Sequence, residues 1–225
     1  MNFLVGNSKG YNTKKPDIMI TEKRNNKIKQ VVTDRQLDLI MVLENVHDPH
    51  NIGAVIRSCD AVGIHQIHII YSEEGLHCDN RYIGKRSSRG ALKWSEVVYH
   101  TSLFKCMDIV RPQVSQIVAT HLGESAKSVY ETDFTQSTAF LFGNEKDGLS
   151  KDALAFADQN IIIPMHGMVQ SLNISVACAV TIFEAQRQRM GAGLYQDTSN
   201  NLSEEKILLY EEYLAISKPT KEVQY

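Results

Sequence analysis

Polar side chains that can do chemistry gather in three turns, each placed between a short apolar run and a helical pattern. The first turn runs from Leu43 to Gly53, and Arg57 follows it in the helix. Ligands of open α/β sheets bind at such strand ends, where a helix also offers free N–H groups to an anion. We expect Asn45, Asn51 and Arg57 to face this crevice. The alternative is that Asn51 only caps the helix and that Arg57 only lies on its solvent face.

The second turn lies within Phe140–Ser150 and contains Gly143 and Gly148. Glycine permits backbone shapes and close approaches that a side chain forbids, so the turn suits a backbone cradle for a ligand. Glu145 is the carboxylate between the two glycines. Turns rich in glycine, asparagine and aspartate are common, however, so this turn alone is weak evidence for a site.

The third turn lies within Ile161–Ser175 and carries Gln170, Ser171 and Asn173. It connects a buried strand to a long apolar helix. Packing alone does not explain so polar a loop in that place, because its polar groups need partners. The sequence therefore favours a functional role for this turn.

Several familiar sites are missing from these turns. None contains the GxGxxG pattern of dinucleotide-binding proteins, the phosphate-binding loop of nucleoside triphosphatases or the GxSxG turn of hydrolases. His47 and His50 flank Asp48-Pro49, but no third metal ligand is well placed beside them. The four cysteines lie far apart without a CxxC pair. They indicate reduced thiols, and neither a disulfide framework nor a zinc site is expected.

Short apolar runs that alternate with amphipathic helices predict an α/β fold with a parallel sheet flanked by helices. We expect strands at Leu39–Leu43, Gln66–Ile70, Gln116–Ala119, Ala139–Phe142 and Asn160–Ile163. Helices are expected after Thr21 to about Val32, from Ile52 through Cys59 to a cap at Gly63, after Ser150, over Leu172–Gln188 and after Ser203.

The predicted order of the chain has three parts. Residues 1–35 form an N-terminal arm and a basic helix that bears Lys23, Arg24, Lys27 and Lys29. Residues 36–190 form the α/β domain, and residues 191–225 form a C-terminal helical extension. The basic helix is read equally well as a solvated face or as a contact for RNA.

The bulk composition limits the kinds of partner. The net charge is −2, so the whole molecule does not attract phosphates strongly and any nucleic-acid site must be local. The start of the sequence lacks the basic and apolar regions of a signal peptide. The longest apolar stretch is too short to cross a bilayer. We therefore expect a cytoplasmic protein with no membrane partner.

Taken together, the three turns resemble the three motifs of the SPOUT superfamily, and within it the SpoU or TrmH family of tRNA (guanosine-2′-O-)-methyltransferases. The matching segments are Glu44–Asn51 with Arg57, Phe142–Gly148 and Ile163–Asn173, and the resemblance covers roughly residues 17 to 195. It implies a parallel α/β domain with a C-terminal trefoil knot, an exception to the rule against knots, and a homodimer.

The resemblance also implies roles for individual residues. S-adenosylmethionine is expected to bind through backbone groups around Thr120, Gly143, Ile163 and Leu172. The catalytic residues are expected to be Asn51, Arg57, Glu145, Ser171 and Asn173, and no metal is expected. From their positive charge, and not from the resemblance, Lys23, Arg24, Lys27 and Arg86 are expected to hold RNA, with Arg81, Lys85 and Arg89 beside them in a region that varies within the family.

In accounts of this family, the arginine that matches Arg57 activates the 2′-hydroxyl, sometimes as a base. A guanidinium keeps its proton in proteins, so we interpret Arg57 as an electrostatic stabiliser of the developing alkoxide and not as a base.

Three functions remain open from the sequence. The first is methylation of the D-loop guanosine at position 18 of tRNA. The second is the same reaction on ribosomal RNA, which relatives with a separate N-terminal RNA-binding domain perform; the short segment before the first strand argues against it. The third is a knotted RNA-binding protein without catalysis. The presence of Arg57, Glu145, Ser171 and Asn173 together argues against the third.

Overall fold

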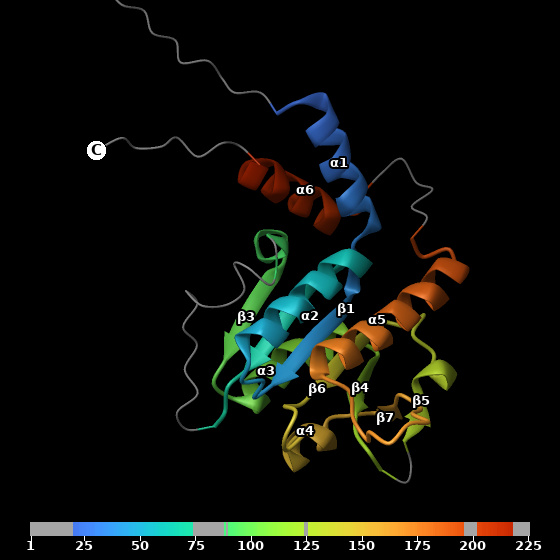
Figure 1. Ribbon diagram of the computed structural model, residues 1–225. Coiled ribbons are helices and arrows are strands. Elements are labelled where there is room, and N and C mark those ends of the chain that lie inside the picture. Colours follow the sequence, from blue (N-terminus) through green and yellow to red (C-terminus); the bar gives the residue numbers. More distant parts are fainter. Residues whose placement is uncertain (1–19, 74–87, 89, 124–125, 196–201, 218–225) are drawn as a thin grey trace, which may run out of the picture.

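The computed structural model describes residues 20–73, 88, 90–123, 126–195 and 202–217 (Figure 1). Within these residues, seven strands form one sheet in the order β3-β2-β1-β6-β4-β7-β5, and every neighbouring pair is parallel. The strands are β1 (Gln36–Glu44), β2 (Ile64–Ile70), β3 (Glu96–His100), β4 (Gln116–Thr120), β5 (Lys127–Ser128), β6 (Thr138–Phe142) and β7 (Gln159–Ile162).

Helices cover both faces of the sheet. On one face α2 (Pro49–Val62) and α5 (Ile174–Gly191) pack against strand residues such as Leu39 and Met41. On the other face α3 (Leu103–Val110) and α4 (Lys151–Ala155) pack against Ile40 and Val42. Alternate residues of β1 therefore belong to two separate apolar cores, as expected for a parallel sheet that is buried on both sides.

The two terminal helices pack against each other, as Figure 1 shows. They are α1 (Glu22–Asp34) and α6 (Glu204–Ser217), and Ile28 and Val32 of α1 share an apolar cluster with α6. In α6, Tyr213 is buried, and its hydroxyl accepts hydrogen bonds from the buried guanidinium of Arg35 at 3.1 and 2.8 Å. Arg35 also pairs with Asp60 of α2 at 2.7 Å, so α6 is connected to the α/β core.

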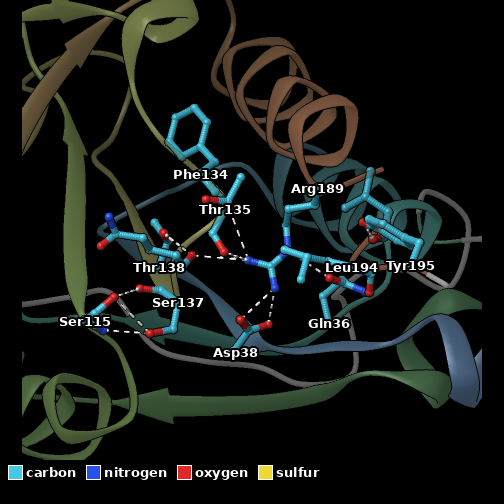
Figure 2. Close-up of polar contacts among 12 residues, drawn as sticks. Gln36, Asp38, Ser115, Phe134, Thr135, Ser137, Thr138, Arg189, Leu194 and Tyr195 are labelled. Carbon is cyan, nitrogen blue, oxygen red and sulfur yellow. Dashed lines mark hydrogen bonds and ion pairs between the residues drawn. The ribbon is translucent and has the colours of Figure 1, made fainter. Parts of the chain in front are cut away.

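A second buried arginine holds the far end of α5 to the sheet (Figure 2). The Arg189 guanidinium donates to both carboxylate oxygens of Asp38 at 2.6 Å and to Gln36 Oε1 at 2.8 Å. It also donates to the carbonyl oxygens of residues 134 to 136. A buried charge needs such partners, and these ones fix α5 to β1 and to the turn before β6.

The structure confirms the α/β fold with a parallel sheet and all five expected strands. It adds β3, β5 and α3, which the sequence did not predict. Strand β5 has two residues, and β3 is a half-buried edge strand without clear alternation. Helix α3 does carry a signal: Ser102 caps it, and Leu103, Cys106, Met107 and Val110 have helical spacing. Three short 3₁₀ helices, Ala91–Trp94, Arg111–Gln113 and Val129–Glu131, complete the described elements.

The predicted helix ends hold to within a few residues. Thr21 caps α1, Ser150 caps α4, and Gly63 ends α2 in the left-handed region at φ 88°. Helix α5 begins at Ile174 and not at Leu172, because Asn173 is its N-cap. Among the described residues, no helix is long and apolar enough to span a membrane. Residues 1–19 of the expected N-terminal arm lie outside the described residues.

Candidate active site

The three polar turns lie together at the carboxyl ends of the strands, because they follow β1, β6 and β7, which are parallel strands of one sheet. A cavity of about 480 Å³ opens between the second and third turns and the end of β4. A volume of this size suits a small-molecule ligand. The residues that line it are Thr120, His121, Leu122, Phe142, Gly143, Asn144, Glu145, Lys146, Asp147, Gly148, Leu149, Ile161, Ile162, Ile163, Met165, Gln170, Ser171, Leu172, Ile174 and Ala177.

All four residues expected to bind a cofactor, Thr120, Gly143, Ile163 and Leu172, line this cavity. Two residues of the expected catalytic set, Glu145 and Ser171, line it as well. The sequence did not single out His121, Lys146 or Met165. Each lies within two residues of a residue that was predicted to belong to the site. Their position just after the end of a strand could therefore have identified them.

The second turn is built around a contact that requires glycine. A Cβ atom on Gly143 would stand 2.1 Å from the carbonyl carbon and oxygen of Gly148, and Gly148 itself has φ +71°. Asn144 closes the turn: its Oδ1 accepts hydrogen bonds from the backbone N–H groups of Lys146 and Asp147 at 2.9 and 2.7 Å. The turn is therefore a compact, internally bonded loop that presents backbone groups to the cavity, as the two glycines predicted.

Asn51 joins the three turns. Its side-chain amide donates a hydrogen bond to Glu145 Oε1 in the second turn. Its own Oδ1 accepts a hydrogen bond from Asn173 Nδ2 in the third turn at 3.1 Å. Asn51 is not the cap of α2, since Asp48 caps that helix by accepting a hydrogen bond from the backbone N–H of His50. Three expected catalytic residues that are far apart in the sequence thus form one polar chain.

Asn45 does not face the crevice, so that expectation was wrong. The residue is buried with φ 51°, its Oδ1 accepts from the Ser72 N–H at 2.9 Å, and its Nδ2 donates to Ser72 Oγ at 3.1 Å. These bonds satisfy the side chain within the protein. Asn45 therefore holds the end of β1 beside the end of β2, and it does not line the cavity.

Arg57 lies outside the cavity lining. Its side chain is exposed on α2, and among the described residues no acceptor makes a hydrogen bond with its guanidinium. A guanidinium offers five N–H donors and is always charged. Arg57 is therefore available to an anionic partner that approaches from solvent, which leaves both sequence-based readings of it open.

A positive surface lies on α1, away from the cavity. Lys23, Arg24, Lys27 and Lys29 are all exposed. The Arg24 guanidinium stands 5.2 Å from the ring centroid of Trp94, and the Lys93 ammonium stands 4.8 Å from it. Trp94 therefore brings Lys93 to the basic helix through cation–π contacts, which the sequence alone did not indicate. Arg86, Arg81, Lys85 and Arg89 lie outside the described residues.

His68, His100 and Cys106 bring their side-chain nitrogen and sulfur atoms within 4.8 Å of one another, under α3. The His68 Nδ1 and the His100 Nε2 are 2.8 Å apart, in rings inclined by 20°. Two nitrogen ligands of one tetrahedral zinc ion are about 3.3 Å apart. The spacing is therefore that of a hydrogen bond between two imidazoles. Burial raises the pKa of the Cys106 thiol to about 12, so this cysteine is a protonated core residue.

The arrangement of loops corresponds to a known family. The sequence model of the SpoU rRNA methylase family matches residues 38–183, which include all three turns and the cavity. The chain belongs to this SpoU family. Its relatives include a tRNA (guanosine(18)-2′-O)-methyltransferase of Thermus thermophilus, which is 47% identical over 175 residues, or 78% of this chain and 88% of the relative.

Solved structures of SpoU proteins have the same fold. The TrmH/SpoU tRNA modifying enzyme of Aquifex aeolicus superposes with a TM-score of 0.76 at 34% identity and covers 88% of this chain and 98% of its own. The SpoU methyltransferase AviRb of Streptomyces viridochromogenes, in complex with its cofactor AdoMet, superposes with a TM-score of 0.60 at 32% identity, over 70% of this SpoU chain and 62% of AviRb.

Proposed function

We propose that this protein transfers a methyl group from S-adenosylmethionine to the ribose 2′-hydroxyl of the guanosine at position 18 of tRNA. The observation that carries the proposal is the chain of hydrogen bonds from Glu145 through Asn51 to Asn173, which joins the three turns at the edge of the cavity. Membership of the SpoU family supports a methyl transfer to RNA. The Thermus relative, which this chain matches over most of its length, supports guanosine 18 of tRNA.

The residues of the cavity fit the cofactor. S-adenosylmethionine, when bound, supplies a methyl group on a positively charged sulfur, and the 2′-oxygen forms a bond to that carbon as the carbon–sulfur bond breaks. Gly143 lets the second turn close against the backbone of Gly148, which sets the shape of one wall, and Thr120, Ile163 and Leu172 line the rest of the cavity. The four residues therefore act mainly through shape and backbone groups.

The polar residues at the rim act on the RNA. As the 2′-hydroxyl loses its proton to solvent or to a nearby acceptor, negative charge develops on the oxygen. A preorganised positive donor stabilises such charge. The exposed guanidinium of Arg57 has no acceptor among the described residues, so it is free to bind the adjacent phosphate and the developing alkoxide. Asn51 orients Glu145 and Asn173, and Ser171 offers a hydroxyl in the cavity wall.

The tRNA is proposed to lie across α1 as well as the cavity. Lys23, Arg24, Lys27 and the added Lys93 give a local positive surface on a protein whose net charge is −2. Phosphate contacts position a nucleic acid without reading its sequence. Arg86 remains a proposed contact.

We propose a homodimer because helix α5 exposes apolar side chains. Its outward side chains Val176, Phe183 and Met190 recur every seven residues and are 46%, 48% and 58% exposed. An apolar stripe of this kind marks a protein interface.

We also propose the trefoil knot: after β7 the chain returns across the sheet, so that α5 packs against α2. A cytoplasmic location, where tRNA is found, fits this function.

Methylation of bulk tRNA with methyl-labelled S-adenosylmethionine tests the function. The expected result is label in 2′-O-methylguanosine that maps to the D loop. Label in ribosomal RNA but not in tRNA would favour the second candidate, a ribosomal RNA methyltransferase. RNA binding without any transfer of label would favour a non-catalytic protein.

A further inference from the structure

A buried carboxylate connects the end of β1 to the second turn. Glu44 is the last residue of β1 and is 2% exposed. Its two oxygens bind one residue: Oε2 accepts a hydrogen bond from the Ser150 N–H at 2.8 Å, and Oε1 accepts one from the Ser150 hydroxyl at 2.7 Å. Carboxylates are rarely buried unless they are paired, so this contact is a specific feature of the fold.

Ser150 is the point at which the second turn ends. It is the N-cap of α4, and its Oγ accepts a hydrogen bond from the Ala153 N–H at 3.1 Å. The turn begins at the end of β6, whose position the sheet fixes. Within the turn, Asn144 and the contact between Gly143 and Gly148 set the shape. The two hydrogen bonds between Glu44 and Ser150 therefore fix the position of the C-terminal end of this turn.

The turn supplies a wall of the cavity, whereas Glu44 does not line it. We propose that Glu44 is a positioning residue, which fixes the turn from Gly143 to Ser150 in the shape that binds S-adenosylmethionine. This inference rests on the proposed function, in that the ligand of the cavity is this cofactor. Both oxygens of Glu44 accept hydrogen bonds from Ser150, which suits a carboxylate. Glutamine keeps one oxygen for the Ser150 N–H but places an N–H against the Ser150 hydroxyl, which must then turn from donor to acceptor, and the negative charge is lost.

The test measures cofactor binding separately from turnover. Calorimetry gives the dissociation constant for S-adenosylmethionine in the wild-type protein, Glu44→Gln, Ser150→Ala and the double variant. Kinetics with tRNA give KM for the cofactor and kcat at saturation. We expect Glu44→Gln to raise both the dissociation constant and KM roughly tenfold, the scale of one charge-assisted hydrogen bond, while kcat changes much less.

Ser150→Ala is the milder variant, because Ser150 is exposed and keeps its backbone N–H after the change. If the two residues act as one unit, Ser150→Ala weakens cofactor binding in the wild-type background and adds little in the Glu44→Gln background. Equal effects in both backgrounds would contradict the coupling.

Asp158→Asn is the control for a carboxylate far from the cavity. The Asp158 carboxylate also accepts a hydrogen bond from a backbone N–H, that of Ile117 at 2.7 Å, at the opposite end of the strands; unlike Glu44, its side chain is 43% exposed and pairs with Arg111. It is expected to lower the urea midpoint of unfolding without changing the cofactor dissociation constant. If Glu44→Gln lowers stability to the same extent and binds the cofactor like the wild type, Glu44 is only structural. A wild-type protein that binds no S-adenosylmethionine would instead refute the proposed function.

Discussion

Asn51 and Arg57 belong to the same helix but differ in their surroundings. Asn51 is held between Glu145 and Asn173, whereas the guanidinium of Arg57 has no acceptor among the described residues. A side chain that is already bonded within the protein orients other groups. An exposed, charged side chain without such a bond is available to the substrate. The two residues should therefore affect catalysis in different ways.

Replacing Arg57 should separate turnover from cofactor binding. We expect Arg57→Ala to lower the single-turnover rate by about 10² to 10³, the usual effect of removing one preorganised stabiliser of developing charge. The dissociation constant for S-adenosylmethionine should stay the same, because Arg57 does not line the cavity. Calorimetry and single-turnover kinetics measure the two quantities. Near-normal turnover in this variant would remove Arg57 from the mechanism.

The sequence predicted the site at the level of turns better than at the level of side chains. Polar, glycine-containing turns after apolar runs mark the carboxyl edge of a parallel sheet, so the three turns were identifiable. Individual pairings were not, because Asn51 and Glu145 are 94 residues apart and periodicity carries no information on such contacts. For the same reason, Asn45 was grouped with Asn51 although it bonds to Ser72.

At the scale of elements, the RNA-binding role proposed for the basic helix α1 depends on where the helix is held. Its apolar side packs on α6, and its charged side is exposed beside Lys93. Helix α1 and its cap were predictable from Thr21 and the lysine and arginine pattern. The contribution of Trp94 was not, because Lys93 lies in a 3₁₀ helix that the sequence did not indicate.

Neutralising α1 should weaken tRNA binding and reduce its salt dependence. In Lys23→Ala/Arg24→Ala, two phosphate contacts would be lost, and the log–log slope of affinity against salt should flatten by about two units. Cofactor binding should not change. Filter binding at several salt concentrations measures the slope, and Lys105→Ala on α3 is the control. An unchanged slope in the double variant would mean that tRNA docks elsewhere.

At the scale of the whole molecule, stability should fall in mild acid. Burial, with a contribution from His100, lowers the pKa of His68 to about 4, and burial and Arg35 lower that of His65 to about 4. Protonation then favours the unfolded chain, so the stability present above pH 6.5 is lost as the pH falls toward 4.

The expected loss is about 1.4 kcal/mol per pH unit for each histidine that the folded state keeps neutral. Urea unfolding at a series of pH values measures it. His68→Gln should flatten the dependence below pH 6.5, whereas His121→Gln, at an exposed position, should not. If His68→Gln shows the wild-type dependence, His68 does not contribute to acid unfolding.

The apolar stripe on α5 predicts the oligomeric state. Sedimentation should give the mass of a dimer for the wild-type protein. Phe183→Lys places a charge in the proposed interface and should shift the equilibrium toward monomer. Phe104→Lys is the matched control, since Phe104 is an aromatic side chain of α3 that is 58% exposed, against 48% for Phe183. A fully active wild-type monomer at all concentrations would rule out the dimer.

The central claim is the transfer of a methyl group to one ribose hydroxyl, and one pair of tRNA molecules tests it most directly. A tRNA with guanosine at position 18 is compared with the same tRNA that carries 2′-deoxyguanosine there, both incubated with methyl-labelled S-adenosylmethionine. We predict one methyl group on the first tRNA and none on the second, with similar binding of both. Equal labelling of the two molecules, or no labelling of the first, would contradict the proposed function.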